Sequence, residues 1–340
     1  MVRPGQRPAK FDDAWATPDE AGQRPATSAP ASGPTEGEVA MSTFLPPEHE
    51  LPGHATKAVL RPGVPVDAEV CGRVCYQAFA TLADRHGFPA DFPSPEVAVA
   101  AVAALLAHPG IYSVVAELDG RVVGSNFLDE RSAVAGVGPV TVAQNVQDAG
   151  VGRALMVDVM RRAEQRGFPG VRLLQAAYHN RSLSLYAKLG FQIRETVLNM
   201  QGEPPGGAPL GHFVRRATTE DLRECNRVCR AVHGHDRAGE LRDAVAHGAA
   251  RVVEHDGRIT GYTTNVGFFG HSVAMTNEGL EALIATADEF SGPGLLVPGR
   301  NDQLVGWCLR HGMRIRMVTT LMTVGLYNEP FGAYLPSILY

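Results

Sequence analysis

The feature that most constrains this chain is a short glycine-containing stretch near its middle, Gln147-Asp-Ala-Gly-Val-Gly-Arg-Ala-Leu155. An apolar run with β character, residues 138–143, precedes it, and about sixteen residues with helical periodicity follow it. The pattern predicts a strand, a glycine loop and a helix start. A helix N-terminus attracts anions through unpaired N–H groups, and Gly150 and Gly152 lack the Cβ atoms that would keep an anion away. The ligand that this arrangement favours is a phosphate group.

The spacing of the glycines limits which class of phosphate-containing ligand the loop could bind. A dinucleotide fingerprint needs a third glycine where Leu155 stands, and a P-loop needs Gly-Lys-Ser/Thr, which is absent. What remains is Gln-x-x-Gly-x-Gly, formed by Gln147, Gly150 and Gly152. With the strand before it, this pattern resembles the pyrophosphate-binding motif of the GCN5-related N-acetyltransferase (GNAT) family, whose loop amides hold the pyrophosphate of acetyl-coenzyme A. A tight strand-to-helix turn without a ligand is the alternative interpretation of so short a motif.

A second motif follows about thirty residues later, after a predicted buried strand at residues 171–177. Asn180 stands before a short helix, Tyr186 comes six residues on, and Gly190-Phe191 ends the segment. This is similar to the second GNAT motif, in which the Asn caps the helix and contacts the coenzyme arm while the Tyr faces the sulfur. Tyr186 alone could equally be a core residue. The two motifs in order are more specific than either one.

The resemblance implies which residues hold the coenzyme and what the coenzyme is. The co-substrate is acetyl-CoA or another acyl-CoA, with no metal. The implied coenzyme-binding residues are Val142, Gln147, Ala149, Gly150, Val151, Gly152, Arg153, Asn180 and Tyr186.

Acyl transfer to an amine requires the free base, so a general base is needed within reach of the amine. The candidates are His179, beside Asn180, and Glu130, at the end of a predicted hairpin; the ordinary pKa of histidine places His179 slightly first, and Glu130 matches a region where the family often has a carboxylate. The resemblance makes Tyr186 the acid for the leaving thiolate. A backbone N–H within residues 142–144 is expected to stabilise the oxyanion.

A loop with two aromatic residues, residues 87–93, separates two predicted helices near residues 67–85 and 95–106. It resembles the part of the GNAT fold that covers the acceptor, and a hydrophobic anchor is the alternative. Residues 112–118 and 121–128 alternate as strands around Asp119-Gly120, which predicts a tight hairpin.

The composition along the chain predicts four segments. Residues 1–50 are rich in Pro, Ala, Gly, Ser and Thr, and we expect them to be a disordered extension, with Met41 as an alternative start. Residues 51–200 are expected to form the catalytic domain, residues 201–211 a linker, and residues 212–340 a second domain.

The second domain repeats parts of the first in the same order. Cys71-x₃-Cys75 recurs as Cys225-x₃-Cys229, Glu117…Arg121 as Glu254…Arg258, and Asn180…Gly190 as Asn301…Gly312. In place of the glycine loop stands Met275-Thr-Asn-Glu-Gly-Leu-Glu-Ala-Leu283, whose two carboxylates would repel a pyrophosphate. We therefore predict an α/β fold of two tandem GNAT-like domains, each a mixed, mostly antiparallel twisted sheet flanked by helices, with the second domain degenerate for coenzyme binding.

Charge and composition exclude several classes of partner. A net charge of −5 and a pI near 6.2 argue against nucleic acid and against an anionic membrane. No apolar run approaches the length of a membrane span, so a cytoplasmic protein is expected. Heavy use of Ala, Gly, Arg and Val suggests a bacterial genome. The oligomeric state stays open, with a homodimer as one option.

Two groups of residues have metal-ligand character. The paired cysteines could together bind zinc, but duplication of a core-facing helix explains them without a metal. His233-Gly-His235-Asp236 follows a helix and matches no fixed metal motif, so a solvated loop is expected.

These observations together predict an acyl-CoA-dependent N-acyltransferase, with acetyl as the favoured group and the amine of a small molecule, such as an antibiotic or another specialised metabolite, as acceptor. The alternative is a non-catalytic acyl-CoA-binding regulatory or interaction protein on the same fold. The second domain is expected to close the acceptor cleft. A fragment ending near Gln201 is expected to keep acyl-CoA binding.

Overall fold

The computed structural model describes residues 44–45, 57–88 and 90–339, which belong to one compact unit. The predicted disordered extension, including Met41, therefore lies almost entirely outside the described residues. Its two described members differ from the expectation, because Phe44 and Leu45 pack against the core of the first half and their amides donate to Glu164 Oε1 (2.6 and 3.1 Å). Burial of these two large apolar side chains is energetically favourable.

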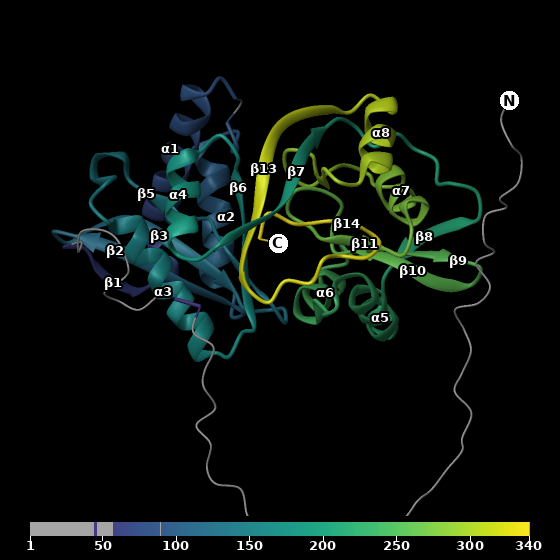
Figure 1. Ribbon diagram of the computed structural model, residues 1–340, viewed down its shortest axis with the longest axis horizontal. Helices are drawn as coiled ribbons and strands as arrows, with labels where there is room; N and C mark the ends of the chain where they lie inside the picture. Colours follow the sequence, from purple (N-terminus) through teal and green to yellow (C-terminus); the bar gives the residue numbers. More distant parts are fainter. Residues whose placement is uncertain (1–43, 46–56, 89, 340) are drawn as a thin grey trace, which may run out of the picture. The chain divides into compact units, whose positions relative to one another are not determined.

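The first half, residues 57–201, alternates strands and helices (Figure 1). Its elements are β1 (Val59–Pro62), α1 (Ala68–Arg85), α2 (Pro95–Ala107), β2 (Ile111–Leu118), β3 (Arg121–Asp129), β4 (Ala135–Val137), β5 (Thr141–Val142), α3 (Val151–Gln165), β6 (Gly170–Ala176), α4 (Asn180–Lys188) and β7 (Gln192–Gln201).

The second half, residues 212–339, repeats this order without a counterpart of β5 and with one added strand at its end. It follows residues 202–211, which contain no helix or strand. Its elements are β8 (His212–Arg216), α5 (Leu222–His233), α6 (Ala238–Ala246), β9 (Arg251–His255), β10 (Arg258–Thr263), β11 (Ser272–Ala274), α7 (Asn277–Ala285), β12 (Leu295–Pro298), α8 (Asp302–Arg310), β13 (Arg314–Gly325) and β14 (Ala333–Leu335). The structure thus confirms the predicted α/β fold with two similar halves.

An ion-pair arrangement is repeated in both halves. In the first, Arg61 of β1 donates to Asp67 (2.8 Å), just before α1, and to Glu117 of β2 (2.8 Å). In the second, Arg215 of β8 makes the same contacts with Asp221 (2.7 Å) and Glu254 (2.8 Å). The same side chains at equivalent places support duplication more directly than element order does.

The hairpin between β2 and β3 forms as predicted. Asp119 and Gly120 both have positive φ (50° and 73°), and Leu118 pairs with Arg121. Asp256 and Gly257 make the equivalent turn in the second half (50° and 70°). These turns need positive φ at both central residues, which Asp-Gly tolerates.

The two halves exchange their last long strands, which the sequence did not predict. Strand β13 of the second half lies between β6 and β7, with Leu321 opposite both Leu174 and Glu195. Strand β7 in turn pairs with β12 of the second half. The resulting sheet has the order β1-β2-β3-β4-β6-β13-β7-β12. Figure 1 shows β13 between β6 and β7.

A short C-terminal strand distinguishes the second sheet, whose order is β14-β11-β10-β9-β8. In the first half, β4 pairs directly and in parallel with β6. In the second, β14 pairs with β11, the counterpart of β4, and Ala333 and Leu335 share a core with Leu295 and Val297 of β12. Strand β14 therefore takes the place beside β11 that β6 takes beside β4, and it separates β11 from β12, the counterpart of β6 in chain order.

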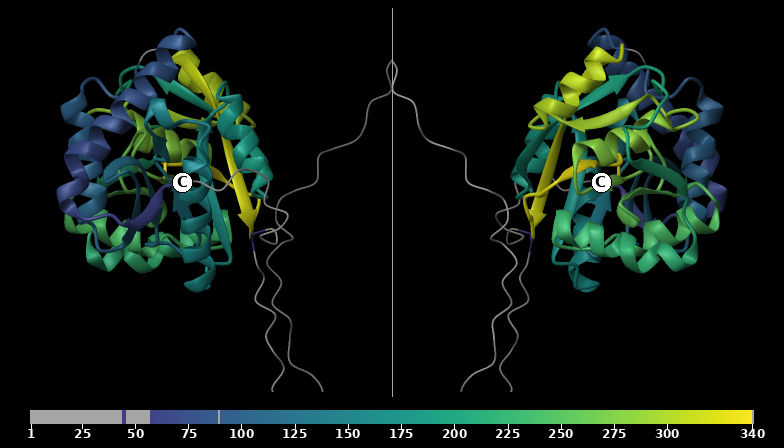
Figure 2. Two further views of the ribbon diagram at one scale, coloured as in Figure 1. Left: turned by 90° about the vertical axis from the view of Figure 1, so that its left-hand side faces the viewer. Right: turned by 90° about the vertical axis from the view of Figure 1, so that its right-hand side faces the viewer.

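Helices cover both faces of the first sheet (Figure 2). Helices α3 and α4 pack in one core with Val171 and Leu173 of β6, and α1 and α2 pack in another with Val115 and Phe127. Arg131, just after β3, joins the halves by donating to Asp129 (2.6 Å) and to Asp243 of α6 (3.1 Å). Within the part of the chain that is described, no helix is both long and apolar enough to cross a membrane.

Candidate active site

A cavity of about 1190 Å³ opens where β5 and β6 diverge. Strand β4 pairs with β6 at Ala135–Val171 and Gly136–Arg172, whereas β5 pairs with β3. Beyond these pairs, residues on both sides of the gap, from Val137 to Val142 and from Leu173 to Ala176, line the cavity. The divergence of two neighbouring strands thus creates a slot within the sheet.

The start of α3 faces this cavity. Gly150 precedes the helix with φ of 77°, a conformation that favours glycine, and α3 begins at Val151 without a side-chain cap. The amides of Val151, Gly152 and Arg153 have no intrahelical acceptors, because a helix leaves its first N–H groups unpaired. The helix start therefore offers hydrogen-bond donors to a ligand.

Gly152 has a different reason to be glycine. It lies within the helix, and an added Cβ would meet Val142 Cγ2 at 3.6 Å and Leu185 Cδ2 at 3.8 Å, both ordinary van der Waals contacts. The protein's own packing would accept a larger residue here. A ligand that approaches the backbone closely explains the glycine.

Helix α4 holds the loop in place. Arg181 forms an ion pair with Asp148 and donates to Gln147 Oε1 (3.1 Å), and Gln147 Nε2 donates to the carbonyl of Val142 (3.4 Å). Of the predicted coenzyme-binding residues, the cavity is lined by Val142, Gln147, Gly150, Val151, Gly152, Arg153, Asn180 and Tyr186. Ala149 does not line it, and its N–H donates to the carbonyl of Val146 (3.4 Å).

The helix start at α4 differs from the prediction by one residue. His179 is the N-cap, and Asn180 is the exposed first residue of the helix. The equivalent N-cap of α8 is Asn301, with nearly the same backbone angles, and both caps stand eleven residues before a glycine of positive φ, Gly190 or Gly312. Asn301 therefore corresponds to His179, not to Asn180.

Three side chains at the start of α4 and within it, those of His179, Ser182 and Tyr186, lie in a row beside the slot. His179 Nδ1 lies 2.7 Å from Ser182 Oγ, and Ser182 lowers the pKa of the Tyr186 hydroxyl. All three residues line the cavity. The spacing of three and four residues places these side chains on one helix face.

Burial changes the pKa values of His179 and Tyr186. The pKa of His179 is lowered from its ordinary 6.5, mainly by burial and also by Arg181 and His86. Burial raises the pKa of Tyr186 to about 12, and the hydrogen bond with Ser182 opposes part of that change. At neutral pH, His179 is therefore a neutral base and Tyr186 a protonated acid.

The structure does not bring Glu130 into the cavity. Its carboxylate accepts two hydrogen bonds from Arg162 (2.6 and 3.1 Å) and forms a longer ion pair with Arg166 (3.5 Å). Its position at the end of β3 points the side chain toward α3, which sequence spacing could not reveal.

The predicted oxyanion segment, residues 142–144, contains one amide that is already paired. The amide of Ala143 donates to the carbonyl of Val123 (2.8 Å) and is not available to an oxyanion.

The second half supplies part of the cavity wall. Phe268 and Phe269, between β10 and β11, line it together with Met317 of β13 and Ile338, which follows β14. Sequence reasoning did not identify these residues, because their proximity depends on the exchanged strand. It also missed Gln175, a buried glutamine on β6 whose two amide atoms have no partner among the described residues. The sequence signal that could have identified Gln175 is a glutamine within a strand of mostly buried residues.

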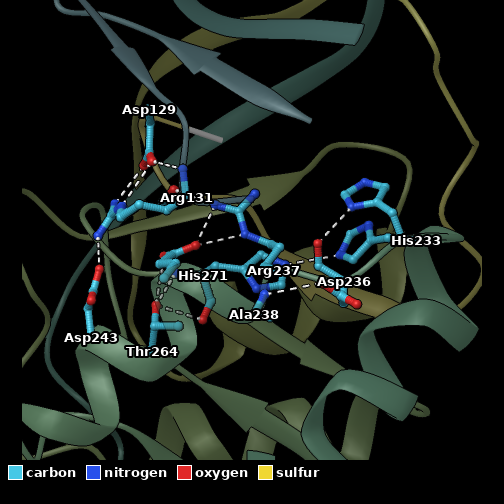
Figure 3. Close-up of polar contacts among 12 residues, drawn as sticks. Asp129, Arg131, His233, Asp236, Arg237, Ala238, Asp243, Thr264 and His271 are labelled. Carbon is cyan, nitrogen blue, oxygen red and sulfur yellow. Dashed lines mark hydrogen bonds and ion pairs between the residues drawn. The ribbon is translucent and has the colours of Figure 1, made fainter. Parts of the chain in front are cut away.

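The histidine cluster was expected to be solvated and is instead buried (Figure 3). His233 and His271 are 1% and 0% exposed, and their Nε2 atoms lie 3.0 Å apart. The end of α5 packs against Tyr334 of β14, which removes His233 from solvent. In the described ranges, no group of three or more His, Cys, Asp or Glu residues could hold a metal ion.

Comparison with known proteins identifies the class. The family model described as Acetyltransferase (GNAT) family matches residues 79–191, which include the glycine loop, His179 and Tyr186. Residues 79–191, about a third of the chain, are therefore similar to the GNAT family. This likeness supports acyl transfer as the general activity.

Solved structures extend the likeness over both halves. A candidate acetyltransferase from Pyrococcus horikoshii aligns with a TM-score of 0.64 at 17% identity, covering 82% of this chain and 95% of its own. A GCN5-related N-acetyltransferase from Sphaerobacter thermophilus aligns with a TM-score of 0.53 at 15% identity, covering 80% and 96%. A tandem GNAT protein from the clavulanic acid biosynthesis pathway aligns with a TM-score of 0.48 at 16% identity, covering 79% and 98%. No match was found among curated proteins.

Proposed function

We propose that the protein is an acyl-CoA-dependent N-acyltransferase, with acetyl-CoA as the favoured donor and the amine of a small molecule as acceptor. The observation that carries the proposal is Gly152, a helical glycine whose missing Cβ leaves room at an uncapped helix start beside the cavity. A pyrophosphate is the group that such a site fits. Arg153, Arg181 and Lys188 also line the cavity and add positive charge.

The coenzyme brings an acyl thioester, and the residues of α4 supply proton transfer. In this proposal His179 Nε2 accepts the proton that the attacking amine loses, while its Nδ1–H donates to Ser182. Ser182 donates to the oxygen of Tyr186, and the hydroxyl of Tyr186 protonates the departing thiolate. One proton leaves the amine and one reaches the sulfur, so the three residues hold the same number of protons before and after the reaction. His179 ends with its proton on Nε2, and exchange with water returns the proton to Nδ1 before the next turnover.

The second half is assigned no coenzyme site in this proposal. Helix α7, the counterpart of α3, carries Glu278 in its first turn, and the side chain of Thr276 accepts from the amide of Gly279 (3.3 Å). The donors at this helix start are thus partly satisfied, and the added charge opposes an anion. Strand β14 also packs between β11 and β12, where the first half has its slot.

Continuous release of free CoA from acetyl-CoA, dependent on an added primary amine, tests this function. We expect multiple turnovers per chain. Binding of acetyl-CoA without amine-dependent release across a broad amine panel would instead support the alternative of a non-catalytic acyl-CoA-binding protein.

A further inference from the structure

One end of the cavity has apolar, aromatic walls. Phe79 and Phe92 meet edge to face (6.0 Å between ring centroids), and Tyr178 stacks on Phe88 (4.5 Å). The aromatic residues Phe79, Phe92, Tyr178, Phe268 and Phe269 all line the cavity. Walls of this kind favour a ligand with an apolar, flat body over a hydrated polyol.

One carboxylate lies in this end of the cavity. Asp91 lines the cavity, and its Oδ1 is buried and has no hydrogen-bond partner within the described ranges. Burial raises the pKa of Asp91, and Arg316 opposes that change. Arg316 is not a lining residue; it donates to the carbonyl of Ala90 (3.0 Å) and so lies beside the Asp91 loop. An ionised carboxylate with an unused acceptor in a low-dielectric cavity binds a cation well.

The charges lining the cavity limit how many cations the ligand can carry. Among the described lining residues the acidic ones are Asp91 and Asp148, and Asp148 is already paired with Arg181 in the glycine loop. Arg85 also lines the cavity and would repel additional cations. The cavity therefore matches one ammonium group.

We infer that the acceptor is a primary amine carrying a single positive charge on an apolar, aromatic-sized body, and that Asp91 binds its ammonium group. This inference rests on the proposed function. Asp91 attracts the cation on entry, and His179 then receives the proton that the amine must lose. Polycationic acceptors such as polyamines and aminoglycosides are disfavoured, because a second ammonium would find no acidic partner.

The test uses phenethylamine, with 2-phenylethanol and spermidine as the neutral and polycationic comparison probes. Binding to the full-length protein is measured by calorimetry with and without free CoA, and turnover by release of CoA from acetyl-CoA. We expect phenethylamine to bind at least about tenfold more tightly than 2-phenylethanol, and to be acetylated with a kcat/KM above that of spermidine. Equal affinity for the amine and the alcohol, or faster turnover of spermidine, would overturn the inference.

The variant Asp91→Asn removes the charge with little change in shape. It should weaken phenethylamine binding at least about tenfold and leave acetyl-CoA affinity unchanged, while Asp84→Asn, an exposed position on the same helix–loop segment, changes neither. Unchanged phenethylamine binding in Asp91→Asn contradicts the inference. The comparison of probes on the unmodified protein decides the matter even if the variant does not fold. Failure of acetyl-CoA to bind refutes the proposed function separately, since amine binding is measured without it.

Discussion

Tyr186 is the residue whose chemistry in the proposal can be separated most cleanly from its packing. Its side chain is 7% exposed within the core of the first half, and Ser182, which contacts His179, lowers the pKa of its hydroxyl. Removing only the hydroxyl keeps the packing and removes the proton donor.

We predict that Tyr186→Phe lowers kcat at least about 10²-fold and changes acetyl-CoA affinity less than about threefold. Tyr112→Phe is the control, because Tyr112 also hydrogen-bonds through its hydroxyl, to Asp158 (2.8 Å), but does not line the cavity. Steady-state kinetics and calorimetry measure the two effects. If Tyr186→Phe turns over at the parent rate, the hydroxyl has no role in proton transfer.

The buried histidines make a prediction about stability. Burial lowers the pKa of His233 and His271 well below 6.5, and burial together with Arg172 lowers that of His235 to about 4. The unfolded chain therefore binds more protons than the folded chain below pH 6.5. The stability that these histidines contribute by staying neutral is fully present above about pH 6.5 and is lost as the pH falls toward 4. For His235 alone the loss approaches about 3 kcal/mol.

Urea denaturation at pH 7.5, 6 and 5 measures this dependence. The free energy of unfolding should fall with pH, and His235→Gln should reduce the slope. His311→Gln, at an exposed histidine, serves as the matched control. Equal slopes for both variants would show that His235 does not titrate as a buried group.

At the scale of elements, local sequence patterns predicted the turns and helix starts that depend on neighbouring residues. They did not predict which distant strands pair. The Asp119-Gly120 hairpin and the start of α3 depend on neighbouring residues, and both formed where the sequence indicated. The pairing of β13 with β6 joins residues about 150 positions apart (Thr319↔Ala176 to Gly325↔Gly170), and no local pattern encodes it.

The same distinction applies to the candidate site. His179 and Tyr186 were found through a short motif on one helix, and the structure brings both to the cavity. Glu130 pairs with Arg162 and does not line the cavity, because strand residues alternate faces and spacing did not show which face meets the cavity. Phe268 and Met317 reach the cavity from the second half, so only the three-dimensional arrangement reveals them.

The exchanged strands make a prediction about the whole molecule. A fragment ending at Gln201 was expected from the sequence to bind acyl-CoA alone. The structure argues otherwise, because removing the second half also removes β13, which joins β6 to β7. The fragment would expose two strand edges and part of the cavity wall.

We therefore predict that residues 41–201 and residues 202–340 are each poorly folded alone, and that mixing them restores structure and acetyl-CoA binding. Circular dichroism reports the folding and calorimetry the binding. A soluble, folded fragment of residues 41–201 that binds acetyl-CoA by itself would show that β13 is dispensable for the first sheet.

The central claim is that one chain holds one acyl-CoA, at the glycine loop of the first half. Calorimetric titration with acetyl-CoA should give one site per chain. In Gly152→Asp the carboxylate should abolish binding with little change in folding, since an added Cβ has room within the protein. Gly306→Asp, at a helical glycine of α8 outside the cavity, should bind one equivalent like the parent. Two equivalents per chain, or unchanged affinity in Gly152→Asp, would contradict the account.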